Sequence, residues 1–244
     1  MNLKYQYTLF FTIAISIFLN AQNQSLDLSG SWKVTLNTDN PAVDNSSGKN
    51  KMEGTIQLPS SLAQQGYGIK TEGSEFGILT PEYKYLGVAI FEKEIEIPKE
   101  WKSKQFEIFL ERVLWQSKVF LDGKELSTQD ALGTPHVHKL GNISPGKHKL
   151  TIEIDNEMIH NIGDKGHAYG AYTQSIWNGI VGRMELMTKD ATHISNIRTF
   201  SDVDKDRLTV ELNIQSEKKG KAKLFLEIYE LGTAKIVQKI EVKE

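Results

Sequence analysis

Residues 91–97 read FEKEIEI, and this stretch decides the fold: most odd positions are apolar and every even position is glutamate. Residues 148–155 (HKLTIEID) alternate in the same way, with Leu150, Ile152 and Ile154 on one side. Successive side chains of a strand point to opposite faces of a sheet, so a period of two is typical of a strand with one buried face. We therefore predict strands at both places, with Glu92, Glu94 and Glu96 on a solvated face.

Turn signals separate further strands of the same kind. Residues 119–121 (VFL) and 124–126 (KEL) flank Asp122-Gly123, a pair that readily adopts the positive φ angles of a type I′ hairpin turn. Pro145-Gly146 marks another turn. Sustained helical periodicity is almost absent. We predict an all-β chain whose main domain, residues 26–188, is a jelly-roll β-sandwich.

Two stretches interrupt the alternation. Residues 37–50 are rich in Asn, Asp, Ser and Gly, which predicts a loop. Residues 60–81 have few alternating apolar positions and are long for a structureless connection. The second stretch is therefore either functional or packed against another part of the protein.

A second set of strands follows Lys189-Asp190. Residues 208–214, 223–229 and 235–242 carry strand patterns, and the first has an apolar edge at its even positions. An immunoglobulin-like sandwich requires about seven strands and about 100 residues. Residues 190–244 thus predict only the start of such a sandwich, with apolar faces and no opposing sheet.

The first 21 residues predict a secretory signal peptide. Lys4 precedes an apolar run at 8–19 (TLFFTIAISIFL), and the small residue Ala21 stands at the expected cleavage site. The run is short for a bilayer span, and no basic stop-transfer cluster follows it. We expect a periplasmic or secreted chain without membrane contact after cleavage.

Composition excludes several functions. The chain has no cysteine, which excludes disulfides, lipid attachment through a lipobox cysteine and thiolate zinc sites. Its net charge is -2, and its 29 Lys and Arg are interspersed among 31 Asp and Glu. The absence of a basic patch argues against nucleic-acid binding. We expect no cofactor.

Ten short stretches, taken in order, match one enzyme family. They are LSGSWKV at 28–34, LP at 58–59, YLGVAIF at 85–91, IPKEW at 97–101, FLERV at 109–113, VFLDGK at 119–124, GTPH at 133–136, PGKHKLTI at 145–152, DN at 155–156 and TQSIWNGIVG at 173–182. Together they resemble the amino-terminal sugar-binding domain of family 2 glycoside hydrolases, the group of β-galactosidases, β-glucuronidases and β-mannosidases. The last stretch resembles the signature of such enzymes from Bacteroidota.

The resemblance implies a galactose-binding-like jelly roll, then an immunoglobulin-like domain, then a catalytic barrel that these residues do not include. Retaining hydrolysis requires two carboxylates about 5–5.5 Å apart, and the family carries both on that barrel. We therefore nominate no catalytic residue. Glu111, beside Arg112 and Trp115, is explained equally well as part of a buried ion pair.

Sugar recognition requires aromatic faces and planar amides, usually on loops. Residues 167–179 (HAYGAYTQSIWNG) concentrate both types. The resemblance implies that this segment approaches the active-site mouth of the barrel. Our candidate substrate contacts are His167, Tyr169, Gln174, Trp177 and Asn178. Alternatively, the indole at 177 packs against the barrel or the core without touching sugar.

Galactose specificity is doubtful, since Ser175 stands near the place where an acidic residue reaches the substrate in the best-known β-galactosidases.

Two pairs could contribute to a metal site. His136 and His138 share one face of a strand, as two metal ligands would need, yet no third ligand stands nearby. We expect them to be ordinary polar positions after a turn. Asp155-Asn156 is a weaker candidate for calcium. We therefore predict no metal site.

Three functions remain open at this level. The chain is the sugar-binding region of a glycosidase, with carbohydrate and the barrel of the same polypeptide as partners; or it is a free-standing secreted carbohydrate-binding module; or it only scaffolds protein contacts. The partly formed second sandwich favours the first, because an unpaired strand edge is a liability for a module that works alone.

Overall fold

The computed structural model describes residues 24–37, 51–73, 79–163, 166, 167, 169, 176–205, 207–216, 224–230, 232, 233 and 235–242. Within these ranges the chain forms strands and three short 3₁₀ turns and no α-helix, which confirms the all-β prediction. None of the described segments is a helix of the length and apolarity needed to cross a membrane. The predicted signal peptide and most of the predicted loop at 37–50 lie outside the described residues.

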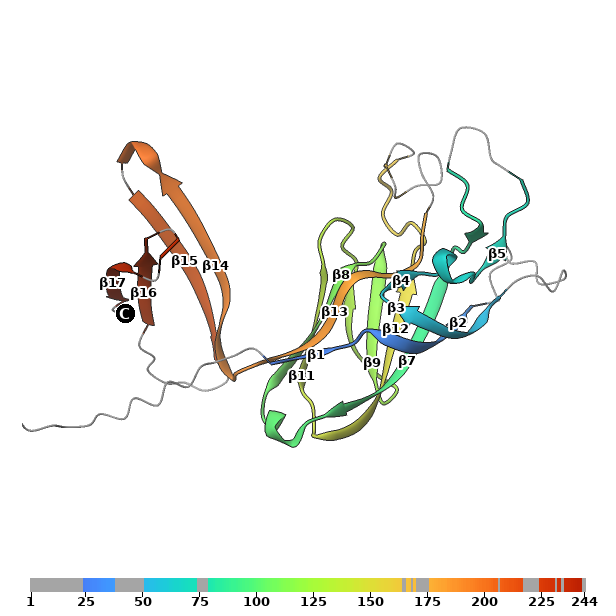
Figure 1. Ribbon diagram of the computed structural model, residues 1–244, viewed down its shortest axis with the longest axis horizontal. Helices are drawn as coiled ribbons and strands as arrows, with labels where there is room; N and C mark the ends of the chain where they lie inside the picture. Colours follow the sequence, from blue (N-terminus) through green and yellow to red (C-terminus); the bar gives the residue numbers. More distant parts are fainter. Residues whose placement is uncertain are drawn as a thin grey trace, which may run out of the picture.

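Two antiparallel sheets form the main domain (Figure 1). The five-stranded sheet has the order β1 (Ser25–Asp27), β13 (Gly179–Lys189), β8 (Gln105–Arg112) and β11 (His136–Asn142), and β4 (Ser60–Ser61) also pairs with β13. The six-stranded sheet has the order β10 (Lys124–Gln129), β9 (Gln116–Leu121), β12 (Gly146–Asp155), β7 (Val88–Ile97), β2 (Gly30–Leu36) and β3 (Glu53–Leu58). This arrangement is a β-sandwich, as predicted.

The alternating stretches occupy the centre of the six-stranded sheet. FEKEIEI lies in β7, which pairs with β12 over its whole length. Phe91, Ile95 and Ile97 are buried. Lys93, the polar exception, is half-buried, and its Nζ donates to the Ser29 carbonyl over 2.6 Å. One face of the strand therefore packs into the core, and the ammonium group of Lys93 is hydrogen-bonded there to backbone carbonyls.

The hairpin prediction is also confirmed. Asp122 and Gly123 join β9 to β10 with φ of 51° and 81°. Positive φ at both central residues is the requirement of a type I′ turn.

Large aromatic residues fill the space between the sheets. Trp32, Tyr67, Phe91 and Phe106 are fully buried in one hydrophobic cluster, and Trp115 is fully buried outside it. Buried polar groups need partners, and the indole N–H of the first donates to the Leu28 carbonyl over 2.8 Å.

The described part of residues 60–81 belongs to this core. After β4 it contains a 3₁₀ turn (Ala63–Gln65) and β5 (Ile69–Lys70), which pairs with β6 (Tyr83–Lys84). Leu62 and Tyr67 are buried, and the hydroxyl of the tyrosine donates to the Thr55 carbonyl over 2.8 Å. This part of the segment is packed against the sandwich.

Residues after 190 form two separate hairpins. β14 (Thr192–Asp202) pairs with β15 (Arg207–Ser216), and β16 (Leu224–Tyr229) pairs with β17 (Ile236–Val242). The last three strands were predicted, whereas β14 was not. Its register shifts between Ile194 and Asn196, and such an irregularity breaks the period of two by which a strand is found.

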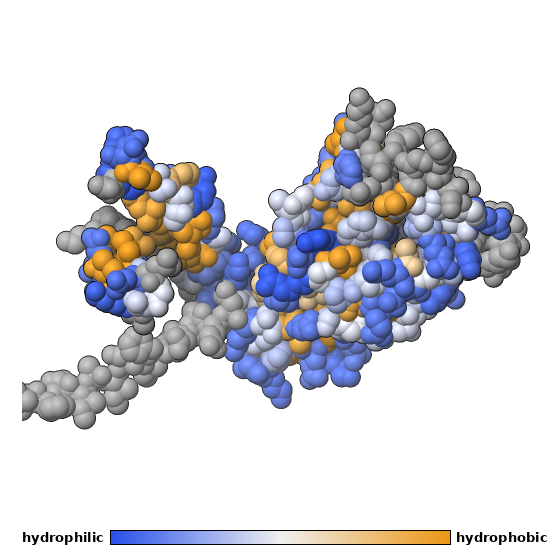
Figure 2. All heavy atoms as spheres, turned by 45° about the horizontal axis from the view of Figure 1, so that its top comes forward, coloured by the Kyte–Doolittle hydropathy of each residue, from blue (hydrophilic) through white to orange (hydrophobic). Residues whose placement is uncertain are grey.

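Apolar side chains of both hairpins are exposed. Ile197, Phe200 and Val237 have exposed fractions of 57%, 50% and 63%. Figure 1 shows both hairpins apart from the sandwich, and Figure 2 shows orange apolar patches over them. An isolated two-stranded hairpin is marginally stable in water. The described residues therefore leave these faces without an opposing sheet.

Candidate functional site

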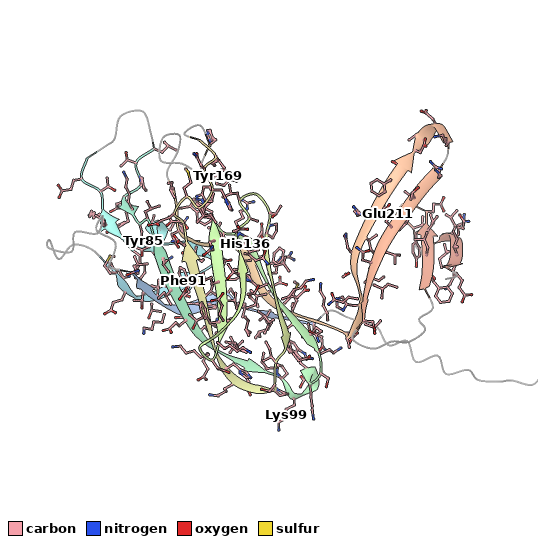
Figure 3. The ribbon with its side chains drawn as sticks, turned by 180° about the vertical axis from the view of Figure 1, so that it is seen from behind. Tyr85, Phe91, Lys99, His136, Tyr169 and Glu211 are labelled. Carbon is pink, nitrogen blue, oxygen red and sulfur yellow. The ribbon has the colours of Figure 1, made fainter. Side chains whose placement is uncertain are left out.

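Of the candidate sugar-contacting segment at 167–179, the structure describes residues 167, 169 and 176–179. Tyr169 lies toward the same end of the sandwich as Tyr85 and His136, opposite Lys99 (Figure 3). Of the five predicted contact residues, Gln174 lies outside the described residues, as does Ser175. The other four are placed, and they belong to different environments.

Asn178 is part of the sandwich interior. It is 2% exposed, and its Nδ2 donates to the carbonyls of Gly87 (3.0 Å) and Ile154 (3.2 Å) and to Asn156 Oδ1 (3.3 Å). An amide with these bonds is committed to the fold. The prediction that Asn178 contacts substrate is therefore corrected: its role is to fix the chain where the segment enters β13.

Asn156 completes a buried pair of amides. Its Oδ1 accepts the Gly87 backbone N–H over 2.9 Å, and its Nδ2 donates to the carbonyls of Tyr85 (2.9 Å) and Trp177 (3.2 Å). The two asparagines thus connect three chain segments that are distant in sequence. This use of the side chain also removes the weak calcium candidate at 155–156.

Trp177 is held by its main chain. Its carbonyl accepts from Asn156, while its side chain is only partly buried. The Trp177 main chain is therefore bonded to the buried asparagine pair, while part of the residue's surface is accessible.

Tyr169 and His167 are the other two candidates that the structure describes. The tyrosine is half-buried, and its hydroxyl donates to the Leu132 carbonyl over 3.3 Å, in the loop between β10 and β11. His167 is exposed. The structure thus ties Tyr169 to one loop and Trp177 to the asparagine pair.

The two β11 histidines, expected to be ordinary polar positions after a turn, are buried. His136 and His138 are fully buried and point from one face of β11 toward Ser117 of β9, whose Oγ lies 2.5 Å from Nδ1 of the first and 2.8 Å from Nε2 of the second. The shared face is as predicted. The described residues contain no group of three side chains that could hold a metal ion.

Burial also changes the proton affinity of these rings. It lowers the pKa of both imidazoles, and for His138 the nearby His136 adds to the effect and brings the pKa to about 4. Both rings are therefore neutral at pH 7. Sequence reasoning missed this cluster because alternation assigns a face to a residue without saying what covers that face.

Glu111 is not in a buried ion pair, which was the alternative offered to a catalytic role. Its side chain is 38% exposed and that of Arg112 is 69% exposed, with 3.8 Å between Oε1 and Nε. Its Oε2 accepts the Arg183 backbone N–H over 2.8 Å, across the irregular pairing of β8 and β13. Trp115 is fully buried, apart from this pair.

The glutamates of β7 are on the outer face, as predicted. Glu92 lies between Lys33 (3.4 Å) and Lys149 (2.5 Å), and Glu94 pairs with Lys147 over 2.8 Å. The hydrogen bond from Lys149, more than any other effect, lowers the pKa of Glu92. These carboxylates form ion pairs with lysines of the neighbouring strands on the solvent-exposed face of the sheet.

Comparison with known proteins places this fold. A scan against protein-family models and a search of curated proteins found no match. Solved structures do match, and one of them is a β-glucuronidase from an uncultured Clostridium species, with a TM-score of 0.62 and 18% identity over 90% of this chain and 38% of that one. The β-glucuronidase from Ruminococcus gnavus in complex with D-glucaro-δ-lactam has a TM-score of 0.65 and 14% identity over 91% of this chain and 38% of that one. The Faecalibacterium prausnitzii β-glucuronidase has a TM-score of 0.64 and 16% identity over 90% of this chain and 39% of that one.

This chain therefore spans well under half the length of the structures it matches. At this level of identity the likeness concerns the fold. The chain has the β-structured fold of the amino-terminal portion of β-glucuronidases.

Proposed function

We propose that this chain is the amino-terminal sugar-binding region of a secreted family 2 glycoside hydrolase that acts in carbohydrate metabolism. The observation that carries the proposal is the fold likeness to β-glucuronidases over 90–91% of the chain. The ten ordered sequence stretches support the same family. In this function the sandwich supports and shapes an active site whose carboxylate pair lies on a barrel outside these residues.

The uncovered hairpins favour this function over a free-standing carbohydrate-binding module. The faces that carry Ile197, Phe200 and Val237 need a second sheet, which a complete immunoglobulin-like domain would supply. A module that works alone has no such cover for them.

Within this function, Trp177 is the substrate-side residue. Its accessible indole surface can stack on a pyranose ring, and the buried asparagines keep its main chain in place. A sugar that stacks on one indole, with no protein surface against its other face, binds weakly, because the entropy lost by ordering the sugar offsets most of the contact energy. We expect the isolated chain to bind monosaccharides with Kd values of about 1 mM or weaker.

Titration of the isolated chain with glucuronic acid, galactose and mannose tests this role. Trp177→Ala is expected to weaken any binding at least about tenfold, while the thermal midpoint stays within about 2–4 °C of that of the parent chain. Phe200→Ala removes an aromatic side chain that is 50% exposed, on β14, and serves as the control with unchanged binding. A fall of the midpoint beyond that range would identify Trp177 as a core residue and end its assignment to sugar contact.

We also propose that the chain is exported and cleaved after Ala21. The apolar run at 8–19 followed by a small residue supports this. Intact-mass analysis of the mature protein should show Gln22 as the first residue. A mature protein that retains Met1 would contradict export by this route.

A further inference from the structure

Both ring nitrogens of His148 lie against oxygen atoms that accept hydrogen bonds. Nδ1 is 2.7 Å from Asp122 Oδ2, and Nε2 is 2.8 Å from the Ser144 carbonyl oxygen. His148 stands on β12, whereas Asp122 belongs to the turn between β9 and β10 and Ser144 to the loop between β11 and β12. One imidazole therefore connects this turn with this loop.

The partners determine how many protons the ring carries. A carbonyl oxygen only accepts, so Nε2 carries a proton, and an ionised carboxylate only accepts, so Nδ1 carries one as well. The hydrogen bond from His148 and that from the Lys149 backbone N–H, which is 2.8 Å from Oδ1, lower the pKa of Asp122, so this carboxyl is ionised at pH 7. A ring that donates from both nitrogens is an imidazolium.

The balance of effects on the ring agrees with this proton count. Burial lowers the pKa of His148, but the hydrogen bonds to Asp122 and to the Ser144 carbonyl, together with the charge of the carboxylate, raise it above its ordinary value of 6.5. The side chain is only 11% exposed, so solvent screens these bonds less than it screens a surface ion pair.

Asp122 is the charged group that contacts this ring. On β7 the apolar Ile95 lies opposite His148, and residues 143–145 of the loop before β12 carry no charged side chain. The neighbours on β12 are Lys147 and Lys149, which form ion pairs with glutamates on the solvated face of the sheet. The second proton of His148 therefore depends on the carboxylate at 122.

The turn itself requires no charge at this position. Asn-Gly and Asp-Gly both suit a type I′ turn. An asparagine at 122 could also accept the Lys149 N–H, but it would bring no negative charge to the imidazole. The carboxylate thus has a task beyond the turn, and His148 is its partner.

A neutral His148 can keep only one of its two bonds. Without a proton on Nδ1, a lone pair would face the carboxylate; without one on Nε2, a lone pair would face the Ser144 carbonyl. The carboxylate is the stronger acceptor, so the bond to Asp122 remains and the bond to the carbonyl is lost. The Ser144 hydroxyl, 3.5 Å from Nε2, can donate to the bare nitrogen only if the loop shifts to bring it closer.

We propose that Asp122 and His148 form a charged clamp between the β9–β10 turn and the loop before β12, and that loss of one proton from His148 frees this loop. The clamp does not depend on the sugar-binding function proposed above. The pKa of His148 is raised on folding, so its contribution to stability is complete below pH 6.5 and is lost as pH rises through the folded value. The pKa of Asp122 is lowered, so its contribution is complete above pH 3.8.

The first test needs no variant. Nitrogen-15 correlation spectra of the imidazoles of the full chain at pH 7 should show His148 with protons on both nitrogens, and its titration midpoint should lie above pH 6.5. A neutral ring at pH 7, or a midpoint at or below 6.5, would overturn the clamp.

The second test uses Asp122→Asn, which keeps the turn and removes the charge. The titration midpoint of His148 should fall by about one pH unit, a tenfold loss of proton affinity. Asp130→Asn is the matched control, because Asp130 also lies 3.0 Å from a histidine nitrogen, that of His160, but these side chains are 58% and 61% exposed. The proton affinity of His160 should change less than about threefold. Equal changes at the two histidines would contradict the clamp.

The third test measures what the clamp does for the fold. The unfolding equilibrium constant of the parent chain, divided by that of His148→Gln, should rise at least about threefold between pH 6 and pH 9. The same ratio formed with His160→Gln should stay constant within about twofold. A constant ratio for His148→Gln would show that the second proton of this ring does not hold the loop.

Discussion

Replacing Asn156 by alanine is expected to lower the free energy of unfolding by about 3–5 kcal/mol. The change removes the acceptor of the Gly87 N–H and the donor to the Tyr85 and Trp177 carbonyls, and it leaves these groups buried and unpaired. Chemical denaturation at pH 7 measures the effect. Sugar binding, where present, should weaken as well, because the main chain at Trp177 loses its support.

Asn142→Ala is the matched control for this loss. That amide also makes two hydrogen bonds, to Lys104 and Gln105, but it is exposed, so water replaces the lost partners. Its cost should be below about 1 kcal/mol. Equal losses in the two variants would mean that the buried amide pair does not hold the end of the sandwich.

Gly179→Ala should destabilise the chain by about 3 kcal/mol or more. Gly179 begins β13 with φ of +128°, and an added Cβ would lie 2.4 Å from the Ser60 carbonyl oxygen and 2.9 Å from the Ser61 Cα. Both atoms belong to backbone, so β4 must move away from β13. Thermal and denaturant unfolding measure the loss.

Gly123→Ala separates backbone strain from this contact. Gly123 also has positive φ, +81°, but nothing lies within 4 Å of an added Cβ. Gly123→Ala is expected to lower the free energy of unfolding by about 1–2 kcal/mol, which is the cost of the backbone strain alone. If both alanine variants lose the same stability, the close approach of β4 to Gly179 is not what requires glycine there.

Local patterns predicted the strands because local geometry governs them. The alternation at 91–97 determines which side chains of β7 face the core, and the Asp122-Gly123 pair suits the positive φ angles of its turn. The irregular β14 escaped prediction for the same reason, since its shifted register interrupts the period.

The candidate site was less accessible to sequence reasoning. The residue types at 167–179 suggested sugar contact for both Trp177 and Asn178, yet one is partly exposed and its neighbour is buried. Which of two adjacent polar or aromatic residues enters the core depends on what packs above it. The partners of Asn178 include Gly87, 91 positions earlier.

The sequence by itself determined that this is an all-β chain, where β7, β9, β10, β12 and the last three strands lie, and that His136 and His138 share one face of a strand. Only the tertiary structure decided that this face meets Ser117 of the other sheet and that Asn156 and Asn178 share a buried bond. The reason is physical: strand periodicity arises between neighbours along the chain, whereas burial and proton affinity arise from groups that approach only when the sheets pack.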